Sequence, residues 1–76
     1  MAGMKDTATI NNAEVKLFST YMGPWEFEVE AEWMPRDEED PGGATIYLDQ
    51  CQSHMVALDR AAEYLRDMVP VRGGTF

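Results

Sequence analysis

A strict alternation between residues 25 and 33 constrains the fold of this chain more than any other feature. Apolar residues at every second position, from Trp25 to Trp33, are separated by single glutamates. Successive side chains of a β-strand point to opposite faces of a sheet, so this period of two predicts a strand with one buried and one exposed face. Burying four unpaired carboxylates would be too unfavourable, so the glutamates belong to the exposed face. They are Glu26, Glu28, Glu30 and Glu32.

The flanking segments predict an α+β fold. Residues 15–22 (VKLFSTYM) are rich in β-branched and aromatic residues and predict a first strand, which a Gly23-Pro24 turn joins to a second strand over residues 25–34. A loop with four breaking residues covers 35–43, and residues 44–49 predict a third strand. Ser53 is a suitable N-cap for a helix over 54–69 that Pro70 ends. The helix has an apolar stripe of Met55, Leu58, Ala62, Leu65 and Val69.

We therefore expect a three-stranded antiparallel meander with one C-terminal helix packed on one face. The register of the first two strands follows from the core. A plain two-residue turn would place Val15 on the glutamate face, whereas one more residue in the turn pairs Thr20 with Glu28 and Lys16 with Glu32. The second register is preferred, because it directs Val15, Leu17 and Tyr21 into the core.

The chain length allows one domain. Seventy-six residues leave no room for a second core. We assign residues 14–70 to this domain, residues 1–13 to a flexible N-terminal arm and residues 71–76 to a flexible tail. Cys51 is the only cysteine, which excludes an internal disulfide and fits a reducing, cytoplasmic location. We find neither the pattern of a signal peptide nor an apolar run long enough for a membrane span.

The negative charge is concentrated in one part of the chain. The net charge is −8, and residues 26–40 hold eight acidic residues against one base, Arg36, which leaves −1 for the rest. Four of these acids are the glutamates of the second strand, and the other four are Asp37, Glu38, Glu39 and Asp40. Nucleic acids and anionic membranes are polyanions, so direct binding to either is not expected. A basic protein surface is the expected partner.

The row of glutamates has two interpretations. Alternation alone is typical of an ordinary solvated sheet face. However, like charges side by side on one strand face reduce stability and are usually diluted, so an undiluted row suggests a use. Its members repeat every ~6.7 Å, twice the rise per strand residue. A straight carboxylate row of this kind can present itself to a site built for a row of phosphates.

Two groups of residues have the composition of a reactive site but lack the spacing that such a site requires. The acidic loop lacks the spacing of a helix-loop-helix calcium site, so no metal is predicted there. Asp49, Cys51, Ser53 and His54 crowd a nucleophile, a base and acids into six residues, but catalytic residues usually converge from separate elements. We predict no catalytic residue and no cofactor.

Two aromatic residues complete the predicted contact surface. In the preferred register Phe18 and Tyr47 point outward on the glutamate face, where they could anchor a partner or could be ordinary exposed apolar surface.

The profile of length, acidity and a sheet with one helix resembles the small acidic proteins with which phages and mobile elements block host defence, namely anti-CRISPR proteins and DNA-mimicking antirestriction proteins. The resemblance involves no motif. It implies a stoichiometric inhibitor that docks on a basic nucleic-acid-binding surface of an effector complex in the host cytosol. We expect the protein itself to be a monomer or a weak dimer. The alternative is a small structural or accessory subunit that docks through strand edges and exposed aromatics.

Overall fold

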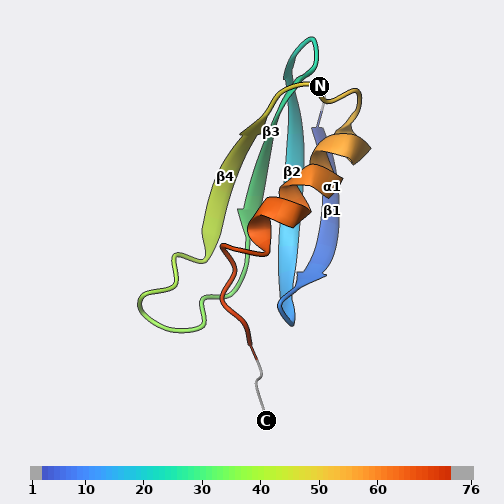
Figure 1. The fold of residues 1–76 in the computed structure, drawn as a ribbon. Helices are drawn as coiled ribbons and strands as arrows, with labels where there is room; N and C mark the ends of the chain where they lie inside the picture. The colour runs from blue at the N-terminus through green and yellow to red at the C-terminus, as the bar shows by residue number, and fades with distance from the viewer. Residues whose placement is uncertain (1–2, 73–76) are drawn as a thin grey trace.

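The computed structural model describes residues 3–72, which form one antiparallel sheet covered on one face by a helix (Figure 1). The sheet has four strands in the order β1-β2-β3-β4, each paired with its neighbour in sequence. The elements are β1 (Gly3–Ile10), β2 (Ala13–Gly23), β3 (Glu26–Glu32), β4 (Gly43–Leu48) and α1 (His54–Leu65). The α+β class and the C-terminal helix are thus as predicted.

The prediction of three strands is wrong in number, because most of the expected N-terminal arm is strand β1. Gly3–Ile10 pairs along its whole length with β2, from Gly3 opposite Thr20 to Ile10 opposite Ala13. Asn11 and Asn12 form the connecting turn, with φ angles of 54° and 67°. A two-residue turn with positive φ at both positions matches the twist of a hairpin, and asparagine tolerates this conformation better than most residues. The turn therefore folds the polar N-terminal segment onto β2.

The predicted register between β2 and β3 is confirmed. Lys16 lies opposite Glu32 and Thr20 opposite Glu28, and the pairing shifts between Tyr21 and Gly23, where the additional turn residue had been expected. The irregular turn takes Trp25 out of the strand, with a φ of 67°, and leaves its side chain 55% exposed. The predictions that Trp25 and Tyr21 lie in the core are therefore wrong, whereas Trp33, directly after the end of β3, is buried.

The core lies between the sheet and α1. All four strands contribute to it, and Val15 of β2 and Val29 of β3 have no exposed surface. The helix begins as predicted, because Ser53 accepts a hydrogen bond from the backbone of Val56 at 3.3 Å. Its buried residues are Ala57, Leu58, Ala61 and Leu65. Among the described residues, this helix is too short to cross a membrane.

The buried face of α1 lies part of a turn away from the apolar stripe that the sequence predicted. Leu58 and Leu65 are buried as expected, and so is Val69, although the helix ends at Leu65 and turns follow. Met55 is 67% exposed, while Ala57 and Ala61 have no exposed surface. Small residues on the covered face let the helix approach the sheet closely, which the spacing of the larger residues did not reveal.

The segment after the helix is fixed to the β1–β2 turn. The Asn11 side-chain amide donates hydrogen bonds to the carbonyl oxygens of Arg66 and Val69, at 3.0 and 2.7 Å. The backbone N–H of Arg72 donates to the Asn11 carbonyl at 2.9 Å. Arg36 Nη1 also donates to the Val71 carbonyl at 3.2 Å. The predicted flexible tail is thus held at its first two positions, and its remaining residues, 73–76, lie outside the described part of the chain.

Candidate functional site

The face of the sheet opposite the helix is open and is the candidate functional site; we call it the outer face. Its residues follow from the strand register, which aligns side chains in rows across the sheet. One row runs Lys5, Phe18, Glu30 and Thr45, and the next runs Thr7, Lys16, Glu32 and Gly43. A third runs Gly3, Thr20, Glu28 and Tyr47. The helix contacts only the other face, so no element within residues 3–72 covers these rows (Figure 1).

The four glutamates of β3 lie where the alternation predicted. Glu26, Glu30 and Glu32 are exposed and Glu28 is half-buried, whereas the apolar residues between them are buried. None of the four carboxylates forms an ion pair or a side-chain hydrogen bond within residues 3–72. The row is therefore available to a partner.

The outer face is not purely acidic. Strand β1 brings Lys5 into the same row as Glu30, and Lys16 lies directly opposite Glu32. Both lysines are exposed. Lys5 was missed from the sequence because its strand was taken for an arm, and the Asn11-Asn12 turn is the signal that could have placed it. The positive charges lie toward β1, so the acidic character increases toward β3 and its partner β4.

Phe18 and Tyr47 both point outward, as expected. Tyr47 is 72% exposed beside Glu28, and Phe18 is 37% exposed. The Phe18 ring lies against Gly3, where an added Cβ would come within 2.4 Å of the ring. Phe18 is thus partly covered by β1, while Tyr47 is open to contact on the β4 side.

The acidic loop divides into two kinds of carboxylate. Asp37, Glu38 and Glu39 are exposed, and the Asp37 carboxylate forms an ion pair of 3.3 Å with Arg36, the only one among the described residues. Asp40 is buried instead, with 7% of its surface exposed. Its placement differs from that of the other acids predicted to contact a partner.

Asp40 organises the loop through three hydrogen bonds. Its carboxylate accepts from Trp33 Nε1 at 2.8 Å, from the backbone N–H of Arg36 at 2.7 Å and from that of Gly42 at 2.9 Å. Burial alone would raise the pKa of Asp40, but these donors and the nearby charge of Arg72 together lower it below its ordinary value. The Asp40 carboxylate therefore fixes the loop against β3.

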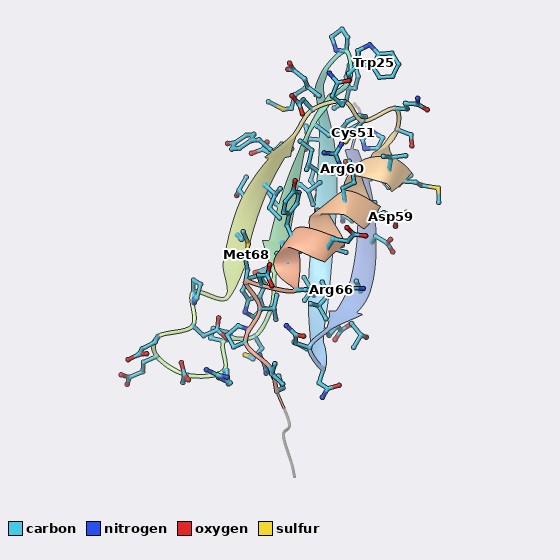
Figure 2. The ribbon with its side chains drawn as sticks, in the orientation of Figure 1. Trp25, Cys51, Asp59, Arg60, Arg66 and Met68 are labelled. Atoms are coloured by element: carbon cyan, nitrogen blue, oxygen red, sulfur yellow. The ribbon has the colours of Figure 1, made fainter. Side chains whose placement is uncertain are left out.

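Exposed apolar side chains gather at the β2–β3 turn. Trp25 lies at the tip of this hairpin and points away from the body of the protein (Figure 2). Met22 is 52% exposed and lines a hollow of about 390 Å³ together with Glu26, Tyr47 and Asp49. The strand prediction had placed Trp25 in the core, so this exposed end of the outer face was missed.

The residues considered for catalysis do not converge. Ser53 caps the helix, and the buried Cys51 has Asp49 O and Arg60 Nη1 as its polar neighbours, at 3.7 and 3.3 Å. His54 turns inward, where its Nδ1 lies 2.8 Å from the hydroxyl of Ser19, which has no exposed surface. These contacts attach the start of the helix to the sheet.

Within residues 3–72, no group of three or more histidine, cysteine or acidic side chains is arranged to hold a metal ion. Comparison with known proteins found no matching family model, no matching curated protein and no matching solved structure.

Proposed function

We propose that this protein is a non-enzymatic acidic binding protein that docks its outer face on a basic, nucleic-acid-binding surface of an effector complex. The observation that carries the proposal is the open row of Glu26, Glu28, Glu30 and Glu32, whose carboxylates have no partner among the described residues. Binding of this kind would make the protein a stoichiometric inhibitor of the anti-CRISPR or DNA-mimic type, acting in the cytoplasm of a host cell.

Two further features support this role. Residues Asp37, Glu38 and Glu39 continue the negative charge beyond the end of β3, in the loop that projects from the sheet (Figure 1). Tyr47 adds an exposed aromatic ring next to Glu28, and an aromatic side chain among charges can supply contact energy that charges alone do not. Charge would accelerate the encounter with a basic partner, and the ring would lengthen the life of the complex.

A second candidate function is that of a small accessory subunit in a larger assembly. It is favoured by exposed apolar side chains just beyond the two ends of the row of glutamates, where Met34 and Trp25 are 74% and 55% exposed. A subunit contact would bury these residues, whereas a mimic of nucleic acid would use mainly the carboxylates.

Salt dependence separates the two functions. The experiment measures binding of the full chain to an immobilised basic nucleic-acid-binding protein at low and at high salt, with an acidic protein as control. A contact made by carboxylates should weaken steeply as the salt concentration rises, because mobile ions screen exposed charges. Nucleic acid added to the basic protein should compete with the chain. Binding that is unchanged by salt and by nucleic acid would instead support the accessory subunit.

A further inference from the structure

The two edges of the sheet differ in how they are protected. Strand β1, at one edge, carries the neighbouring charges Lys5 and Asp6. Strand β4, at the other edge, has the sequence GATIYL and holds neither a charged residue nor a proline. Natural sheets usually protect an open edge with charges, prolines or a covering element, because its free backbone groups can pair with another strand.

The second side of β4 is open along its length. It is the last strand of the sheet, and no element of the described chain lies on the side of β4 that faces away from β3 (Figure 1). Beyond its ladder with β3, the backbone of residues 44–48 makes no hydrogen bond to any described residue. The edge therefore presents backbone donors and acceptors that an added strand could pair.

The side chains next to this edge indicate what kind of strand fits. Glu30 of β3 lies opposite Thr45, and Glu32 lies opposite Gly43. These small residues leave a hollow of about 890 Å³ on the outer face, lined by Glu30, Glu32, Gly43 and Thr45 and extending to Phe18, Lys5 and Lys16. An added strand would lie two strand spacings, about 10 Å, from β3. A long basic side chain on that strand can reach over Gly43 or Thr45 to a glutamate.

We propose that β4 accepts an extended basic segment of the partner as a fifth strand, with lysine or arginine side chains directed over Gly43 and Thr45 onto Glu32 and Glu30. This inference rests on the proposed function and specifies how the contact is made. The strand ladder would supply affinity and the two glutamates would select basic side chains. A second copy of this chain is a poorer occupant, because its net charge of −8 offers the glutamates no complement.

The test uses the isotope-labelled full chain and a short synthetic peptide of alternating lysine and threonine. Two versions of the peptide are N-methylated, one at the lysine amides and the other at the threonine amides. In strand addition, only one of these two sets of amides faces β4. We expect one methylated version to bind about tenfold or more weaker than the parent, because its ladder hydrogen bonds are lost, while the other keeps its affinity. Those backbone amides of residues 44–48 that point away from β3 should become protected from hydrogen exchange, while those already paired with β3 should not change.

Charge variants test the selection of basic side chains. The double variant Glu30→Gln, Glu32→Gln should bind the parent peptide several-fold more weakly. Its control, Glu14→Gln, removes a carboxylate of the same face at the far side of the sheet, opposite Thr9 of β1, and should bind normally.

Three outcomes would overturn the inference. In the first, the two methylated peptides bind equally well. In the second, the parent peptide binds without protecting any β4 amide from hydrogen exchange. In the third, β4 amides become protected without peptide, through self-association of the chain at high protein concentration. If binding to the basic protein still weakened steeply with salt, the proposed function would stand even though this inference had failed. Failure of both experiments would remove both proposals.

Discussion

The row of glutamates on β3 and the acidic loop after it look alike in sequence, with four acidic residues each, but they have different roles in the structure. The carboxylates of Glu26, Glu30 and Glu32 are exposed and accept no hydrogen bond from a described residue. Asp40 is buried and accepts three, two from the backbone and one from Trp33. One region holds charge that the fold does not use, and the other contains a charge on which local structure depends.

The difference follows from the local conformation of the backbone. Along β3, backbone N–H groups pair with β2 and β4, so they cannot satisfy a glutamate of the same strand. In the loop, Gly42 adopts a φ of 71° and leaves its N–H for Asp40. Counting acidic residues therefore overestimates the charge available to a partner, because a carboxylate surrounded by donors is already bound.

The largest effect should come from removing the buried carboxylate. We expect Asp40→Ala to lower the Tm by about 10 °C or more, because the Trp33 indole and two backbone N–H groups lose a charged acceptor. Thermal unfolding followed by circular dichroism measures this change. The matched control is Glu38→Ala, which removes an exposed acid of the same loop and should leave the Tm nearly unchanged. Equal Tm values for the two variants would contradict the structural role of Asp40.

Charge reversal on the outer face should differ from Asp40→Ala, because it should change binding strongly and folding stability only slightly. The variant Glu28→Lys, Glu30→Lys relieves repulsion between like charges, so its Tm should stay the same or rise. Its association with a basic partner should slow by about tenfold or more at low salt, because exposed charges act mainly by steering. Binding kinetics at low and high salt measure this effect.

The control for this variant lies on the exposed side of α1. Asp59→Lys, Glu63→Lys makes the same change in net charge away from the outer face (Figure 2 labels Asp59). If both double variants slowed association equally, net charge would matter and the row of glutamates would have no special role.

Sequence patterns predicted the elements with a strong period and missed those that depend on local turns. The alternation along β3 gave its two faces, and burying Val15 and Leu17 in the core then gave its pairing with β2 and the outward position of Phe18. Strand β1 was missed because half of Gly3–Ile10 is polar and only Ile10, with the partly buried Ala8, packs into the core, so its apolar signal is weak. Its position depends on the Asn11-Asn12 turn, which is a signal of conformation and not of hydrophobicity.

The positions of Trp25 and Asp40 could not be read from periodicity. The irregular turn after Gly23 interrupts the alternation at its first residue, so Trp25 leaves the face that its sequence position predicts. Asp40 is buried because a tryptophan seven residues earlier donates to it across the loop. A contact of this kind depends on the path of the loop. The proline and glycine residues of the loop indicate that the strand ends there, but they do not specify the path that the backbone then takes.

The smallest effect should appear in the response of the two regions to acid. The folded state lowers the pKa of Asp40, so this carboxylate stabilises the fold fully only above the pKa of an unfolded aspartate, about 3.9. That stabilisation is lost as the pH falls from there through the lower pKa of the folded state. The variant Asp40→Asn cannot titrate and keeps one acceptor oxygen. The difference in stability between wild type and variant should therefore be largest near neutral pH and shrink below pH ~4. Urea unfolding at a series of pH values measures it, and Glu38→Gln serves as the control that should show no such change. A difference that stays constant down to strongly acidic pH would mean that the Asp40 charge does not hold the loop.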